Sequence, residues 1–272
     1  MLVAAAVCPH PPLLVPEAMG AVGRRGSDIS AVGQRGSDIG AVGQRGSDIG
    51  SDIGTVLAAC DAAVAGLAAA EPELIVVVGG AAASAVHDGS AAGSLREYGI
   101  RYAVGTGEPV LPLSLTVGSW LLRRAGLVPP DGAARPDETA RPGARVRLRA
   151  VARATPAADC LRLGAAIARQ APRVAVLAMG DGPARRAAGV PGAADPAADR
   201  YDAEVAAALA EADPARLARL APALDDELMV AGRAAWQVLA GAADGGRLHG
   251  RLRCATARYE VSYLVASWDL RS

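Results

Sequence analysis

The hydrophobic positions of this chain fall into two kinds of segment. Short, continuously apolar runs predict strands that are buried on both faces, as in parallel sheets. Longer segments repeat an apolar residue every three or four positions, which predicts helices that bury one face. The strand segments are 2–8, 74–78 and 173–179, and the helical segments are 55–70, 113–125, 155–170, 197–211, 214–221 and 225–242.

Other segments alternate polar and apolar residues, which predicts strands with one solvent-facing side. Residues 145–149 follow this pattern, and 247–254 with 258–267 predict a terminal hairpin, while 100–104 predict one more short strand. The order of all these elements predicts an α/β fold, a three-layer α/β/α sandwich with a mixed, largely parallel central sheet. We interpret residues 1–272 as a single domain.

A tandem decapeptide repeat interrupts the pattern within residues 20–54. The copies at 31–40 and 41–50 are identical, each reading Ala-Val-Gly-Gln-Arg-Gly-Ser-Asp-Ile-Gly. Their Val and Ile residues would line one helical face, but each glycine costs about 1 kcal/mol in a helix interior. We therefore expect a mobile or weakly ordered low-complexity insertion, with a helix beginning only at Thr55.

Composition excludes several classes of function. The chain has 28 basic and 28 acidic residues, so its formal net charge of zero argues against a nucleic-acid partner. Its four cysteines form no Cys-x-x-Cys pair, as is typical of a reduced, cytosolic protein. No segment approaches the length of a membrane span. We expect a soluble, cytoplasmic protein without a membrane partner, and the sequence leaves open whether it forms a homo-oligomer.

The first candidate for chemistry is His10, directly after the first predicted strand. Pro9, Pro11 and Pro12 surround it and each fixes a backbone angle, so the histidine is held rigidly. The carboxyl end of a strand is where open α/β sheets bind ligands. The alternative is that His10 only forms a hydrogen bond to a neighbouring carbonyl.

The stretch Cys8-Pro-His10-Pro-Pro-Leu-Leu-Val-Pro-Glu17 resembles the opening of a known superfamily. This is the superfamily of the catalytic subunits of class III extradiol ring-cleavage dioxygenases, which also includes the Memo-like proteins. Weaker similarity continues at 72–80, 93–99, 174–182 and 225–242. The resemblance implies the same fold, Fe(II) or another divalent metal, and insertion of O₂ into a small catechol-type aromatic substrate. It also implies that His10 and Glu227 are metal ligands; from the residues alone, Glu227 could equally be an acid in the first turn of a helix.

Two positions depart from the family pattern. Where the family has a second histidine ligand, this chain has Gly79-Gly80, and we expect the nearest histidine, His87, in an exposed loop. Where the family has its acid/base histidine, this chain has Asp181, which can act as a base or a ligand, or simply belong to a turn between glycines. We expect the remaining histidine, His249, to face solvent.

The sequence thus supports two main hypotheses. The first is ring cleavage with His10 and Glu227 as metal ligands and Asp181 as the catalytic acid/base group. Such a set, with one histidine and two carboxylates, would favour Mn or Mg over Fe(II), or bind metal weakly. The second is a catalytically inactive or repurposed Memo-like protein that binds a ligand or partner. A hydrolase that uses a metal-bound water is a third alternative.

Overall fold

The computed structural model describes residues 1–17, 39–128, 144–184, 196–258 and 261–270. Its helices are α2 (Ile39–Ala69), α3 (Leu113–Arg124), α4 (Ala157–Ala168), α5 (Pro196–Glu211), α6 (Pro214–Ala218), α7 (Ala223–Leu228) and α8 (Arg233–Ala243). Its strands are β1 (Leu2–Cys8), β2 (Leu74–Ala81), β3 (Ala85–Asp88), β4 (Ala91–Ser94), β5 (Ala103–Val104), β6 (Thr106–Pro109), β7 (Arg145–Ala152), β8 (Val174–Met179), β9 (Leu248–Arg258) and β10 (Val261–Leu270). Two short 3₁₀ helices, η1 (Pro12–Leu14) and η2 (Arg96–Tyr98), complete the described elements.

A seven-stranded sheet in the order β3-β7-β2-β8-β1-β10-β9 forms the centre of the fold. The four inner strands β7, β2, β8 and β1 run parallel to one another. The outer strands are added antiparallel: β3 against β7, and the hairpin β9–β10 against β1. The predicted mixed, largely parallel sheet is therefore confirmed.

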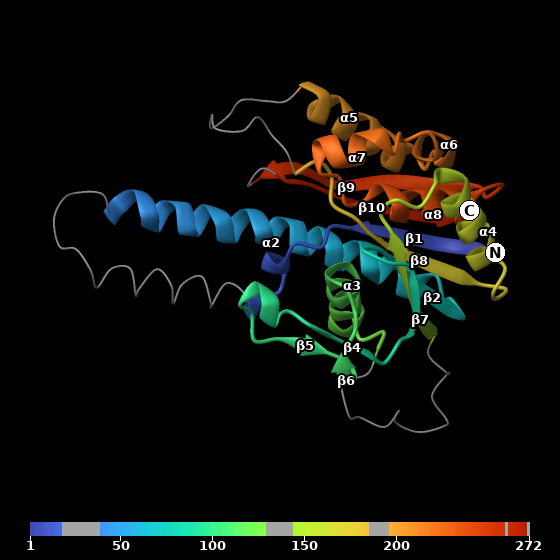
Figure 1. Cartoon of the computed structure of the whole chain (residues 1–272), viewed down its shortest axis with the longest axis horizontal. Helices are drawn as coiled ribbons and strands as arrows, with labels where there is room; N and C mark the ends of the chain where they lie inside the picture. The colour runs from blue at the N-terminus through green and yellow to red at the C-terminus, as the bar shows by residue number, and fades with distance from the viewer. Residues whose placement is uncertain (18–38, 129–143, 185–195, 259–260, 271–272) are drawn as a thin grey trace.

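Helices cover both faces of this sheet and make the three layers (Figure 1). Strand side chains alternate between the two cores, because successive residues of a strand point to opposite faces. On β1, Ala5 and Val7 join the core under α4, α5, α6 and α8, whereas Ala6 and Cys8 join the core under α2 and α3. Every residue of β1 and β8 is buried, which explains their continuously apolar sequence.

The helix α2 corrects the expectation for the repeat. It begins at Ile39, so the copy at 41–50 and the residues 51–54 are helical, while residues 18–38 lie outside the described part of the chain. The seven-and-three spacing of Val and Ile suits a helix, and the alanine-rich stretch after Thr55 extends it without a break. The expectation that no segment approaches the length of a membrane span was wrong, because residues 52–69 are apolar and long enough to cross a membrane. Val56, Cys60 and Leu67 of this segment are, however, buried against the sheet. This segment is a core helix of the fold.

Two further expectations were only partly right. The helix predicted at 225–242 is two helices, because Met229 adopts a left-handed conformation (φ 54°) that ends α7. The strand predicted at 100–104 is reduced to β5, which pairs with β4 in a separate three-stranded sheet of order β5-β4-β6. The strands β3, β4 and β6 were not predicted, since they are short and lack apolar alternation.

Candidate functional site

The candidate site lies where β1 and β8 end. Both strands run in the same direction, so the residues after Cys8 and after Met179 emerge side by side. The Gly180 N–H donates to the Cys8 carbonyl at 3.0 Å and so extends the ladder by one step. His10 and Asp181, 171 residues apart in sequence, therefore become neighbours.

His10 and Asp181 make two contacts. The backbone N–H of His10 donates to Oδ1 of Asp181 at 2.8 Å. The ring Nε2 of His10 lies 3.6 Å from Oδ2 of Asp181, which is ion-pair range for a protonated ring but too long for a hydrogen bond. The side chains are only 9% and 16% exposed, respectively, so the interaction is weakly screened by solvent.

The other ring nitrogen of His10 is unsatisfied. Its Nδ1 is buried and has no hydrogen-bond partner among the described residues. A buried polar atom without a partner costs about 1–3 kcal/mol. A ligand that donates a hydrogen bond to Nδ1 would remove this cost, and Asp181 lies on the opposite, Nε2 side of the same ring.

The turn that follows Asp181 is fixed from two sides. The Ala231 N–H, in the loop between α7 and α8, donates to the Asp181 carbonyl at 3.2 Å. On the other side, Gly182 and Pro183 exchange backbone hydrogen bonds with Ser262 of β10 at 3.0 and 3.1 Å. Asp181 is therefore part of an anchored turn, and its carboxylate is aimed at His10 by the backbone.

The end of β2 explains why no histidine could be accommodated there. A side chain at Gly79 would place its Cβ 2.4 Å from Oγ of Ser114. That hydroxyl donates to the Gly80 carbonyl at 2.8 Å, and so the start of α3 closes this strand end. The start of α3 therefore fills the space that the second histidine ligand expected from the resemblance would need.

His87 does not take that place either. It lies on β3, where it pairs with Leu148 at the edge of the sheet, so the expectation of a loop was wrong. The strand order puts β3 four positions from β1, which corresponds to about 19 Å. His249 is exposed on β9, as expected.

Glu227 is not brought into a metal-type cluster. It lies in the last turn of α7, not in the first turn of a longer helix, and it is exposed. Across the described residues, no group of three or more His, Cys, Asp or Glu side chains is arranged to hold a metal ion. The structure thus brings together His10 and Asp181 from the predicted set, and it does not gather Glu227 with them.

A buried polar network that the sequence analysis did not identify lies beyond the end of β7. Arg233, which is 1% exposed, donates through Nε to Asp225, through Nη1 to Gln237 at 2.7 Å and through both terminal nitrogens to backbone carbonyls after β7. Gln237 in turn donates to the carbonyls of Ala218 and Leu220 at 3.2 and 3.0 Å. The sequence feature that could have predicted this network is an arginine and a glutamine four residues apart in an otherwise apolar helix.

Two buried titratable groups outside the pair are held neutral. Burial, followed by the charge of Asp225, raises the pKa of the Tyr201 hydroxyl. A hydrogen bond with Cys8, together with burial, raises the pKa of the Cys60 thiol well above its usual range. Neither group is an activated nucleophile, because each needs to lose its proton to become one.

His10 and Asp181 are absent from the lining of two hollows formed by described residues. One of about 510 Å³ is lined in part by Arg96 and Arg101. The other, of about 290 Å³, lies between α5 and the β9–β10 hairpin and is lined in part by Asp202 and Ser262. His10 itself is 7% exposed.

The sequence matches no protein-family model and no curated protein. Among solved structures, the crystal structure of uncharacterized protein JW3007 from Escherichia coli K12 is similar to this chain. The two share 15% sequence identity with a TM-score of 0.48, over 97% of this chain and 99% of that chain. That similarity is too distant to indicate a function.

Proposed function

We propose that this chain binds a small molecule bearing a phenolic hydroxyl at His10 and Asp181. It would be a repurposed, cytoplasmic member of the superfamily of class III extradiol dioxygenase catalytic subunits, which the opening motif resembles. The observation that supports this proposal is the buried Nδ1 of His10, which has no described partner and lies on a ring beside a carboxylate.

The chemistry of the pair suits such a ligand. A neutral His10 ring with a free Nδ1 accepts a proton or a hydrogen bond from a hydroxyl. The Asp181 carboxylate, 3.6 Å from Nε2, then stabilises the imidazolium that forms. The site can therefore hold a hydroxylated small aromatic molecule and take a proton from it.

The residues present do not fit the iron site that the resemblance implies. That site requires two histidines and a glutamate on one face, with open positions for substrate and O₂. Here the second histidine position is Gly79-Gly80, and the exposed Glu227 belongs to no described cluster. We therefore assign no step of the chemistry to a metal.

Calorimetric titration tests the proposal, with catechol and 3,4-dihydroxybenzoate as probes. We expect saturable binding by the unmodified protein, and at least tenfold weaker binding by His10→Ala. The matched control is His87→Ala, which removes a histidine at the far edge of the sheet and should leave the affinity unchanged. Equal binding by the His10→Ala protein would contradict the proposal.

Ring cleavage is a second candidate, because His10 and Asp181 adjoin where the resemblance expects a metal ligand and an acid/base group. The protein would be purified under argon, loaded with Fe(II), Mn(II) or Zn(II), and compared with His10→Ala by equilibrium dialysis. Stoichiometric binding that depends on His10, followed by oxygen uptake with catechol, would establish the oxygenase. Catechol binding without metal binding would favour the repurposed protein.

A further inference from the structure

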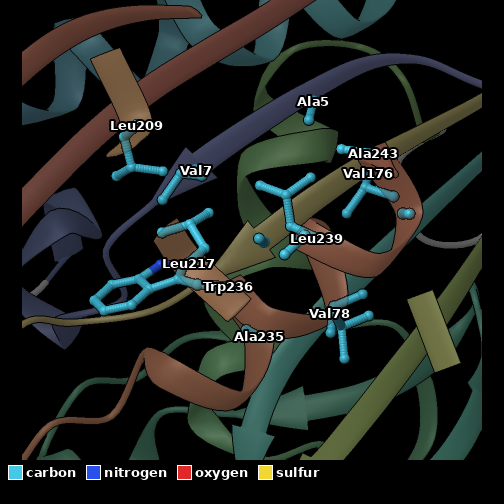
Figure 2. Close-up of a cluster of buried hydrophobic side chains, with 14 of the residues drawn as sticks. Ala5, Val7, Val78, Val176, Leu209, Leu217, Ala235, Trp236, Leu239 and Ala243 are labelled. Carbon is cyan, nitrogen blue, oxygen red and sulfur yellow. The ribbon is translucent and has the colours of Figure 1, made fainter. Parts of the chain in front are cut away.

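We infer that Trp236 is a positioning residue for the His10–Asp181 pair and acts through two glycines, Gly180 and Gly232. The inference rests on the proposed role of that pair. Trp236 comes from α8, in a different layer from the strand ends, and is completely buried. Figure 2 shows its indole beside Leu217 and Val7, at the end of the row of α8 side chains that faces the sheet.

The indole fills the space that side chains at the two glycines would need. A Cβ on Gly180 would lie 2.9 Å from Nε1 of Trp236 and 2.5 Å from the Cα of Gly232. A Cβ on Gly232 would lie 2.2 Å from Cζ2 of Trp236. Gly232 has an ordinary negative φ of −98°, so the requirement at this position is for space and not for conformational freedom.

This contact has a direct consequence for Asp181. Because the backbones of Gly180 and Gly232 touch, the preceding Ala231 N–H can reach the Asp181 carbonyl at 3.2 Å. The Asp181 carboxylate at the same time accepts the His10 N–H at 2.8 Å. The His10 N–H bond to Asp181 is 2.8 Å long, so a shift of the Gly180–Asp181 peptide by about 1 Å along that bond would break it.

Comparison with Trp268 indicates that Trp236 acts through the shape of its ring and not through a hydrogen bond. Trp268 is equally buried, and its Nε1–H donates to the Leu209 carbonyl at 2.8 Å. The Nε1–H of Trp236 has no described partner. An internal hydrogen bond thus accounts for an indole at 268, whereas at 236 the two glycines match the outline of the ring.

The test follows the NMR signal of the His10 ring, which reports its environment, in the absence of any ligand. The chain has three histidines, so selective ¹³C labelling of histidine rings gives three NMR signals, assigned with His87→Gln and His249→Gln. We expect Trp236→Phe and Gly180→Ala to shift the His10 signal beyond its linewidth at constant pH. The signals of His87 and His249 should stay in place.

Two control variants separate positioning from general destabilisation. Trp268→Phe deletes a hydrogen bond from an equally buried indole, and Gly241→Ala introduces a comparable clash in α8, 2.1 Å from the Leu161 carbonyl. Both should lower stability without moving the His10 signal. The inference is overturned if Trp236→Phe, still folded, leaves the His10 signal unchanged, or if Trp268→Phe moves it equally. Failure of the ligand titrations would instead refute only the proposed function.

Discussion

Two buried polar groups lie near the strand ends, and they differ in how completely they are satisfied. In the network beyond β7, Arg233 has partners at Nε, Nη1 and Nη2, and Gln237 has partners at both ends of its amide. In the pair beyond β1 and β8, His10 makes one backbone hydrogen bond and leaves Nδ1 without a described partner.

The difference separates a structural role from a functional one. The network ties α6, α7, α8 and the segment after β7 together, and each nitrogen of the Arg233 guanidinium and both ends of the Gln237 amide are used within the protein. An unsaturated pair adds little to stability, but it offers a buried donor or acceptor that a ligand can complete. We therefore expect changes in the network to affect folding, and changes in the pair to affect binding.

The largest effect should come from Arg233→Met. It keeps much of the apolar volume but removes the arginine from its ion pair with Asp225 and from two backbone carbonyls, and removing one partner of a buried ion pair costs about 3–5 kcal/mol. Urea unfolding followed by circular dichroism measures the loss. Arg253→Met is the control: its arginine is half-buried and donates through Nε to Ser267 at 2.9 Å, so its loss should be about 1 kcal/mol. Equal losses of unfolding free energy in the two variants would mean that the Arg233 network stabilises the fold no more than a single half-buried hydrogen bond does.

Asp181→Asn should have a smaller effect on stability and a larger effect on binding. Asparagine retains an oxygen that can accept the His10 N–H, so the free energy of unfolding should fall by no more than about 1 kcal/mol. The charge beside Nε2 is lost, however, and with it the stabilisation of a protonated ring. Titration with catechol should show weaker binding, whereas unchanged binding would show that the carboxylate of Asp181 takes no part.

Most of the central sheet could be predicted from the sequence. Which residues meet at the candidate site could be predicted only in part. β1, β2 and β8 were predictable because both faces of each strand are buried, so their sequences are continuously apolar. The position of His10 and Asp181 at strand ends followed from this, but their contact depends on β1 and β8 being adjacent, which a local pattern does not contain.

Glu227 illustrates why other parts of the site and fold were predicted wrongly. Its place in a first turn was predicted from a continuous helical pattern at 225–242, but the chain breaks at Met229–Gly232 so that the loop can contact the Asp181 turn. Within that break Gly232 packs against Gly180, 52 positions away, a contact that a local pattern does not contain. Similarly, α2 extends back into the glycine-containing repeat because a long helix continues past residues that would not start one.

The loop between the network and the pair offers a stabilising change, Met229→Gly. Met229 is 55% exposed and adopts a left-handed conformation at the end of α7, where its N–H donates to the Asp225 carbonyl. This is the position at which helices prefer glycine, and a non-glycine residue there costs about 1 kcal/mol. We expect the glycine variant to raise the free energy of unfolding by up to about 1 kcal/mol. Met229→Ala, which keeps the strain, should not; a gain in both variants would point to the lost side chain instead.

The smallest effect should come from Asp88→Asn, in an exposed pair that serves as a reference for both buried groups. Hydrogen bonds from the Ser90 backbone and hydroxyl, followed by the charge of Arg147 at 2.8 Å, lower the pKa of Asp88. A carboxylate whose pKa is lower in the folded state stabilises the protein above its unfolded pKa of about 3.9, and this contribution is lost as pH falls through the folded pKa.

Since Asp88 is largely exposed, solvent screening keeps its contribution below about 0.5 kcal/mol. Urea unfolding at pH 7 and at pH 3 measures it: the difference between Asp88→Asn and the unmodified protein should be small at pH 7 and shrink towards pH 3. A difference that grows as the pH falls would reverse the sign argued here. If Asp88→Asn lowered the free energy of unfolding at pH 7 as much as Arg233→Met does, solvent exposure would not explain the difference between the Asp88–Arg147 and Asp225–Arg233 ion pairs. The exposed pair could then not serve as the reference for the two buried groups.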